Sequence, residues 1–146
     1  MPGRSTSNEP FSRRFELRDA REDIDRVERA IVDAAARQSY DDACRYGLRL
    51  ALGEALTNAF RHGNQDDPAK RVLVDCEVTP RRIVIGVEDE GQGFDPEAVP
   101  DPTQDENVEI PAGRGILLMR AYMTNVVFRA PGNRVEMTYE REDGEG

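Results

Sequence analysis

Apolar residues recur at helical spacing in two segments of the first half of the chain. The first segment follows Asp19, which together with Glu22 has the spacing of a capping box at a helix N-terminus. The second has a similar start signal at Ser39 and Asp42 and ends at Gly63, a residue typical of helix C-termini. The pattern therefore predicts two amphipathic helices. Their apolar positions are Ile24, Val27, Ile31, Ala34 and Ala35 in the first helix, and Leu48, Leu52, Ala55, Leu56, Ala59 and Phe60 in the second.

Five further segments have the pattern of strands, and one has that of a helix. Residues 72–78 alternate between apolar and polar side chains, and residues 83–87 follow after a turn at 79–81, which predicts a β-hairpin. A first strand is expected at residues 12–18, a helix at 116–123, and two closing strands at 126–129 and 134–140.

The order of these elements predicts the fold class. Strands joined by short turns pair antiparallel, whereas successive parallel strands need a helix between them. We therefore expect an α/β (α+β) two-layer sandwich, with a mostly antiparallel mixed sheet and helices packed on one face. A single domain is expected over residues 12–140. It is flanked by a disordered lead (1–11) and an acidic tail (141–146), and a mobile loop rich in proline and acidic residues (96–112) interrupts it.

Composition narrows the classes of partner. The 146 residues carry a formal net charge of −9, so a polyanion such as nucleic acid would be repelled at long range. No apolar run approaches the roughly 20 residues that span a bilayer, and a membrane partner is not expected. Cys44 and Cys76 lack metal-ligand spacing and form no disulfide framework, which favours a reducing cytoplasm.

Three groups of residues carry candidate chemistry, and the first lies on the second predicted helix. Glu54 and Asn58 are four residues apart and share a face, which His62 extends by one turn. The side-chain oxygen of Asn58 is a suitable ligand for Mg²⁺, which shares its oxygen ligands with substrate phosphates. The Glu54 carboxylate is a candidate acceptor for the proton of an attacking hydroxyl or water. A solvated polar helix face is the alternative interpretation of the same pattern.

The second group, Asp89 to Gly93, directly follows an apolar strand. A carboxylate at a strand end can accept a hydrogen bond from an exocyclic amine such as that of adenine. Gly91 and Gly93 remove side chains where a flat base must approach the backbone. An ordinary turn, in which Asp and Gly are favoured, explains the same residues.

The third group, Gly113, Arg114, Gly115 and Ile116, opens the last predicted helix. Free backbone amides at a helix start attract phosphate, and Arg114 adds a charged contact to the terminal phosphate. A dinucleotide fingerprint is excluded because Leu118 stands where its third glycine would be. A flexible hinge explains the glycines equally well.

In combination, these motifs resemble the GHKL superfamily of ATPases and kinases. Glu-x-x-x-Asn on a helix, Asp-x-Gly-x-Gly after a strand and Gly-x-Gly at a later helix occur in this order within residues 39–140. Residues 54–64 and 115–123 are similar to the first and last motifs of the anti-sigma factor serine/threonine-protein kinases. The resemblance implies the Bergerat ATP-binding fold, with ATP and Mg²⁺ as cofactors.

The resemblance also implies the role of each residue. Asn58 would hold Mg²⁺, Asp89 would read adenine, and Glu54 would be the base acting on a serine hydroxyl of a partner protein. Residues 113–115 would cradle the phosphates under a lid formed by residues 96–112.

Two neighbouring residues, Arg61 and His62, are further candidates in this scheme. Arg61 matches a position at which related kinases carry a basic residue that faces phosphate. The only histidine, His62, fits either a ligand contact or a hydrogen-bonding role at the helix end.

The expected function is an ATP-binding anti-sigma regulatory factor with serine/threonine-protein kinase activity. It would transfer the γ-phosphoryl group of ATP to a serine of an antagonist protein and would sequester a sigma factor. The alternative is a nucleotide-dependent protein-binding regulator without significant kinase activity. A homodimer is left open. A sensor histidine kinase is disfavoured because the sequence has no phosphoacceptor helix pair.

Overall fold

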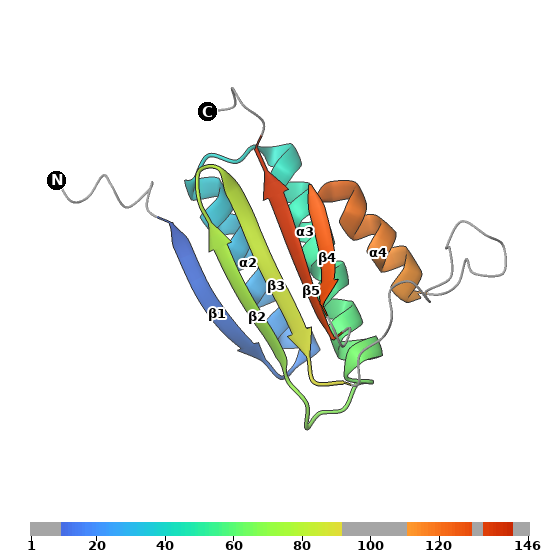
Figure 1. Cartoon of the computed structure of the whole chain (residues 1–146). Helices are drawn as coiled ribbons and strands as arrows, with labels where there is room; N and C mark the ends of the chain where they lie inside the picture. Colours follow the sequence, from blue (N-terminus) through green and yellow to red (C-terminus); the bar gives the residue numbers. More distant parts are fainter. Residues whose placement is uncertain (1–9, 92–110, 130–132, 142–146) are drawn as a thin grey trace.

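A computed structural model describes residues 10–91, 111–129 and 133–141 of the chain. Five strands form one sheet in the order β1-β2-β3-β5-β4, and each neighbouring pair is antiparallel. The helices cover one face of this sheet (Figure 1). The predicted two-layer α+β sandwich is confirmed. The strands are β1 (Phe11–Leu17), β2 (Val72–Val78), β3 (Arg82–Asp89), β4 (Asn125–Arg129) and β5 (Arg134–Glu140).

The helical layer contains α2 (Ala20–Arg37), α3 (Asp42–Asn58) and α4 (Pro111–Tyr122), and α3 continues into the π-helical turn η2 (Ala59–Gly63). Helix α3 contacts both α2 and α4, so it is the central helix of the layer. Helix α4 begins five residues earlier than predicted, because proline fits the first helical turn, where a missing N–H costs nothing. Within the described residues, no helix has both the length and the apolar character needed to cross a bilayer.

The core forms between the helices and alternate residues of the strands. In β3, Ile83, Ile85 and Val87 are buried against the helices, whereas Arg82 is exposed and Glu88 is half-buried on the opposite face. Each fully buried aliphatic side chain stabilises the fold by about 1.5–3 kcal/mol. The predicted stripes of the first two helices supply the other side of this core, including Val27, Ile31, Ala34, Ala35, Leu48, Leu52, Ala55 and Leu56.

The start of α2 is capped as the sequence predicts, with one difference. Asp19 Oδ1 accepts hydrogen bonds from the backbone N–H groups of Arg21 (2.9 Å) and Glu22 (3.2 Å). The reciprocal bond of the capping box comes from Asp23, whose Oδ2 accepts the N–H of Asp19 at 3.0 Å. Asp23 therefore takes the part that the spacing had assigned to Glu22.

The predicted start signal of α3 was wrong by two residues. Ser39 has a positive φ of 67°, and its N–H donates to the carbonyl of Ala36, so it belongs to the end of α2. Asp41 is the N-cap of α3 and accepts the N–H of Cys44 at 2.8 Å. A residue that closes one helix in a left-handed conformation cannot also provide the extended N-cap of the next.

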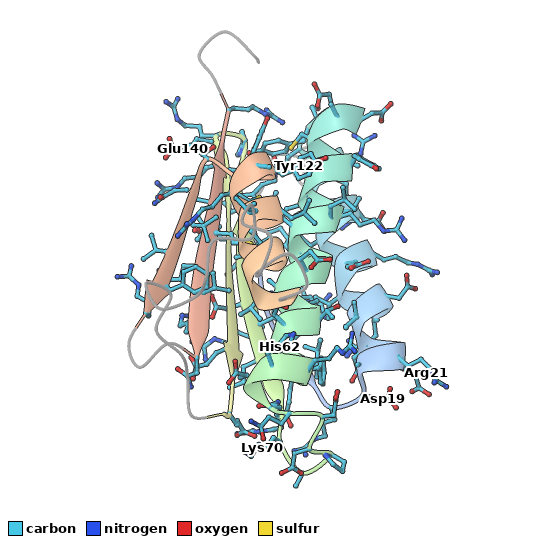
Figure 2. The ribbon with its side chains drawn as sticks, turned by 90° about the vertical axis from the view of Figure 1, so that its right-hand side faces the viewer. Asp19, Arg21, His62, Lys70, Tyr122 and Glu140 are labelled. Atoms are coloured by element: carbon cyan, nitrogen blue, oxygen red, sulfur yellow. The ribbon has the colours of Figure 1, made fainter. Side chains whose placement is uncertain are left out.

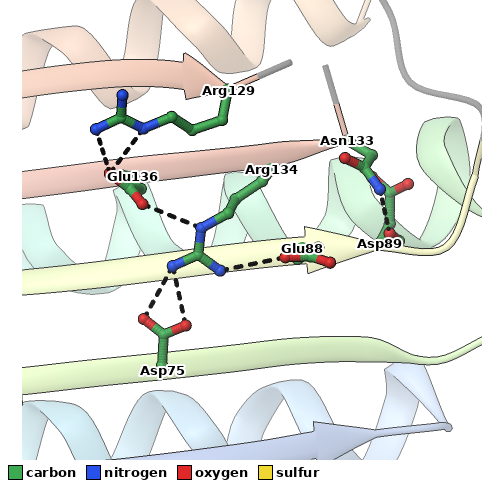
Figure 3. Close-up of polar contacts among 7 residues, drawn as sticks. All are labelled: Asp75, Glu88, Asp89, Arg129, Asn133, Arg134 and Glu136. Carbon is green, nitrogen blue, oxygen red and sulfur yellow. Dashed lines mark hydrogen bonds and ion pairs between the residues drawn. The ribbon is translucent and has the colours of Figure 1, made fainter. Parts of the chain in front are cut away.

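The face of the sheet opposite the helices carries a network of ion pairs, shown in Figure 3. Arg134 on β5 bonds to Asp75 on β2 (2.9 Å), to Glu136 (3.1 Å) and to Glu88 on β3 (3.4 Å). To reach β2, its guanidinium crosses β3 at Gly86, where a Cβ atom would lie 2.7 Å from Arg134 Cζ. Gly86 is therefore required for the ion pair that spans the sheet.

Candidate functional site

Glu54 and Asn58 lie in the last two turns of α3, and Asn58 is its final residue. Both side chains are half-buried, whereas Ala55 and Leu56 between them are buried in the core. Their four-residue spacing places them on one side of the helix. The predicted polar row is therefore present at the margin of the core.

The chain continues beyond Asn58 as a π-helical turn. The N–H of Asn64 donates to the carbonyl of Ala59, five residues earlier, at 2.8 Å. Single π turns of this kind are frequent at functional sites. His62 lies inside this wider turn, four residues beyond Asn58. Arg61 and His62 are both exposed here.

Asp89 ends β3 on the side of the sheet that faces the helices, and only 8% of it is exposed. Its Oδ1 accepts the N–H of Gly91 at 2.8 Å. Its backbone is held by Asn133: Asp89 N donates to Asn133 O, and Asn133 Nδ2 donates to Asp89 O, each at 2.9 Å. Figure 3 shows the second of these bonds. The carboxylate therefore has a fixed position.

Burial also changes the acid–base properties of this carboxylate. Loss of hydration raises the pKa of Asp89 above its usual value, because the charged form is disfavoured in the interior. The hydrogen bond from Gly91 acts in the opposite direction and lowers the pKa, but it is the smaller effect. A buried acceptor of this kind forms a stronger hydrogen bond with a donor than it would in water.

Two glycines bring the first and second motifs together. A Cβ atom on Gly63 would overlap the Asp89 carboxylate, with Oδ1 at 2.7 Å and Oδ2 closer still. A Cβ atom on Gly91 would overlap the carbonyl group of Gly63, whose carbon would lie 2.6 Å away. The end of η2 and the turn after β3 are therefore in direct contact. Gly63 is only five residues beyond Asn58, so the helix motif and the strand-end carboxylate are neighbours.

The third motif lies in the first turns of α4, which runs antiparallel to α3. A Cβ atom on Gly47 would overlap the ring of Tyr122, so the start of α3 lies against the end of α4. Each helical residue adds about 1.5 Å. Gly113 is nine residues before Tyr122, and Leu56 is nine residues after Gly47. Gly113 therefore lies near the level of the last turn of α3. Figures 1 and 2 show the start of α4 toward the end of the molecule at which α3 finishes, and Figure 2 labels His62 at this end.

One part of the third prediction needs correction. Residues 113–115 were expected to open the last helix, but α4 already begins at Pro111. The first few N–H groups of a helix have no partner inside it, which here applies to Ala112 and Gly113, whereas Arg114 and Gly115 lie further into the helix. Ile116 also belongs to α4. Gly93 and the predicted lid up to residue 110 lie outside the described residues.

The residues present fit a magnesium–nucleotide complex. Mg²⁺ binds through few protein ligands and several phosphate and water oxygens, and the Asn58 amide oxygen is a ligand of that kind. In the described part of the chain, no group of three or more His, Cys, Asp or Glu residues forms a cage for a metal ion. In the Asp89 carboxylate, Oδ1 accepts the N–H of Gly91 and Oδ2 faces Gly63. A carboxylate oxygen is a hydrogen-bond acceptor of the kind that an exocyclic amine requires.

Sequence reasoning missed two residues that shape this region. Asn64 was given no role of its own within residues 54–64, yet it is buried and bonds to the backbone at the ends of two strands. Asn133 was not among the candidate residues, although it fixes the backbone of Asp89. Asn is common in turns, so the only available signal was its presence next to a predicted motif or strand end.

Comparison with known proteins gives a family match. The family model for the histidine kinase-like ATPase domain matches residues 17–139, which include Glu54, Asn58 and Asp89. A serine-protein kinase RsbW from Staphylococcus epidermidis is 32% identical over 114 residues, covering 73% of this chain and 70% of that protein.

Two anti-sigma F factors are also similar to the chain. That of Clostridium perfringens (strain SM101) is 29% identical over 89 residues, or 60% of this chain. That of Oceanobacillus iheyensis is 30% identical over 96 residues, or 62% of this chain. The chain spans 64% and 66% of the lengths of these two relatives, slightly less than two thirds. Because the family model matches most of the chain, the chain belongs to the histidine kinase-like ATPase domain family.

Proposed function

We propose that this protein binds Mg·ATP, transfers the γ-phosphoryl group to a serine of an antagonist protein, and sequesters a sigma factor. The observation that carries the proposal is the contact between Gly63 and Asp89, which joins the helix bearing Glu54 and Asn58 to the strand-end carboxylate. The family match supports the ATP-binding part. The names of the relatives, anti-sigma F factor and serine-protein kinase RsbW, support the regulatory and kinase parts.

In this proposal, nucleotide binding depends on local groups, because a net charge of −9 repels free ATP at long range. Asp89 Oδ2 accepts a hydrogen bond from the exocyclic amine of adenine. The Asn58 oxygen would hold Mg²⁺, which would supply positive charge beside the phosphates. The backbone amides in the first turn of α4 and the exposed Arg61 would meet the phosphate oxygens.

The transfer step requires positioning and one base. Glu54 accepts the proton of the serine hydroxyl as its oxygen attacks the γ-phosphorus, and the bond from that phosphorus to the bridging oxygen breaks to release ADP. Glu54 lies one turn before Asn58 on the same side of α3, so the base would lie next to the residue that would hold the metal ion. Little further covalent chemistry is required of the protein.

The test uses ATP labelled at the γ-phosphate, with Mg²⁺, and a panel of candidate antagonists that have a small α/β fold. The expected result is transfer to a single serine of one antagonist, with no transfer when that serine is replaced by alanine. Glu54→Gln keeps the shape of the side chain but removes the base. It should retain ATP affinity and lose transfer by at least about 100-fold.

Two other outcomes have definite meanings. Tight ATP binding without transfer to any antagonist, together with ATP-dependent binding of a sigma factor, would identify a nucleotide-dependent binding regulator in place of a kinase. Failure of the wild-type protein to bind ATP in the presence of Mg²⁺ would overturn the proposal as a whole.

A further inference from the structure

Asn64 directly follows η2 and is one of the few polar residues that the fold buries. It is 1% exposed, and the other buried polar residues of the described chain are Gln38 and Asp89. Its amide bonds to two different strand ends. Nδ2 donates to the carbonyl of Arg71, just before β2, at 2.9 Å, and Oδ1 accepts the N–H of Glu90, just after β3, at 2.8 Å. Asn64 thus links the end of the helical segment to both strands.

The N–H of Glu90 is the middle one of three successive amides in the turn, and each has a different acceptor. Asp89 N donates to Asn133 O, Glu90 N to Asn64 Oδ1, and Gly91 N to Asp89 Oδ1. These acceptors come from the residue before β5, from the residue after η2 and from the last residue of β3. The bond to Asn64 is the one that fixes the turn relative to η2.

An asparagine suits this position because one short amide donates and accepts at the same time. A leucine has a similar shape but would take away the partner of the Arg71 carbonyl and of the Glu90 N–H in a part-buried position, which is unfavourable. An aspartate keeps the acceptor for Glu90 and, when protonated, can also donate to Arg71. Asn64→Leu removes both hydrogen bonds and Asn64→Asp keeps the acceptor for Glu90, so the two substitutions separate loss of the acceptor from loss of the donor.

We propose that Asn64 is a positioning residue for base recognition, and this inference rests on the proposed function in which Asp89 reads adenine. Through the Glu90 amide, Asn64 holds the turn so that Asp89 Oδ2 keeps its direction toward the exocyclic amine. Asn64 itself touches no substrate. Because hydrogen bonds weaken steeply when their geometry is distorted, a shifted turn reduces recognition of the base while phosphate binding is retained.

The test compares the Kd of ATP with that of ITP, whose base has a carbonyl group in place of the exocyclic amine. Both are measured by calorimetry on the full chain with Mg²⁺. Wild type should prefer ATP. Asn64→Leu should reduce this preference about three- to tenfold, the effect of one lost hydrogen bond, with little change in ITP affinity. Asn64→Asp, which keeps the acceptor, should retain most of the preference.

Tyr40→Phe is the matched control for destabilisation alone. It removes the hydrogen bond from Tyr40 Oη to the carbonyl of Thr79 (2.7 Å), which lies just beyond the opposite end of β2. It should lower the melting temperature without changing the ATP preference. If Asn64→Leu does not fold, Asn64→Ser takes its place, because the shorter hydroxyl cannot reach both strand ends.

The outcomes separate this inference from the proposed function. An unchanged ATP preference in folded Asn64→Leu or Asn64→Ser overturns the role of Asn64, and so does an equal loss of preference in Tyr40→Phe. A wild-type protein that binds neither nucleotide overturns the proposed function instead. Equal affinity of the wild-type protein for ATP and ITP would overturn the assignment of Asp89 to adenine recognition.

Discussion

The carbonyl group of Gly63 occupies the place where a side chain on Gly91 would have to be. These glycines are 28 positions apart in the chain, one at the end of η2 and the other after β3. This contact leaves no room for a methyl group on Gly91, and the Asp89 carboxylate leaves none for a methyl group on Gly63. The helix motif and the strand-end carboxylate can therefore lie this close only because both positions are glycine.

Gly63→Ala should weaken ATP binding by at least about tenfold, because its methyl group would overlap the Asp89 carboxylate and force the turn to move. Overpacking of this kind also costs about 1–3 kcal/mol of stability. Calorimetry and thermal unfolding measure the two effects. A Gly63→Ala protein with wild-type ATP affinity would show that this contact does not shape the site.

Gly53→Ala is the control, since its methyl group would meet only the carboxylate of Glu28, at the end of a flexible side chain. Replacing a glycine inside a helix with alanine favours the helix by about 0.5–1 kcal/mol. Gly53→Ala should therefore keep ATP affinity and should match or exceed the wild-type melting temperature.

Local periodicity predicted the framework of this site from the sequence. The alternation of Ile83, Ile85 and Val87 with outward-facing residues identified β3, and the four-residue spacing of Glu54 and Asn58 identified their shared face on α3. Both patterns repeat within a few residues, so one sequence is enough to show them.

Long-range hydrogen bonds and competition between neighbouring caps could not be predicted in this way. Asn64 acts on Glu90, which is 26 residues away, and no periodic pattern links the two. Near α3, both Ser39 and Asp41 suit an N-cap, and the choice depends on how α2 ends. The start of α4 at Pro111 was missed because the preceding polar segment shows no helical period.

Arg134→Gln should destabilise the protein by about 1 kcal/mol at neutral pH and low salt, because three carboxylates lose a shared partner on the open face of the sheet. Hydrogen bonds from Arg129 and Arg134 hold the pKa of Glu136 below its usual value of 4.5. A lowered folded-state pKa gives stability that is present above the unfolded pKa and is lost as the pH falls through the folded one.

The difference between wild type and Arg134→Gln should therefore shrink as the pH falls below 4.5 and as salt is added. Urea unfolding at several pH values measures it. Arg26→Gln removes a single exposed pair with Asp23 (3.3 Å) and should cost less than about 0.5 kcal/mol. Equal losses of stability in the two variants would mean that the Arg134 network stabilises the fold no more than a single exposed ion pair does.

Asn58→Ala should remove the dependence of ATP affinity on Mg²⁺ and leave the fold intact, because Asn58 is half-buried at the end of α3. Calorimetry with ATP, with and without Mg²⁺, measures the change. Glu54→Gln should keep the dependence, since Glu54 is assigned to proton transfer. Wild-type, Mg²⁺-dependent affinity in Asn58→Ala would show that another group holds the metal ion.

Asp89→Asn should increase stability at neutral pH while it weakens recognition of adenine. Burial raises the pKa of Asp89 in the folded state above the usual value of 3.8, so the folded protein holds this proton more tightly than the unfolded chain does. The free energy of unfolding therefore falls as the pH rises from about the unfolded pKa through the folded one. Asparagine carries no charge to desolvate, and its oxygen can still accept the N–H of Gly91.

The stability gain of Asp89→Asn should be largest near neutral pH and should disappear as the pH approaches 3.8 from above. In the same variant, an amide N–H meets the exocyclic amine of adenine, and two donors cannot bond to each other. The ratio of ATP to ITP affinity should fall by about tenfold or more, the value of a hydrogen bond to a charged acceptor. Urea unfolding and calorimetry test the two effects on one protein. A variant that is more stable and keeps its preference for ATP would show that the buried carboxylate does not read the base.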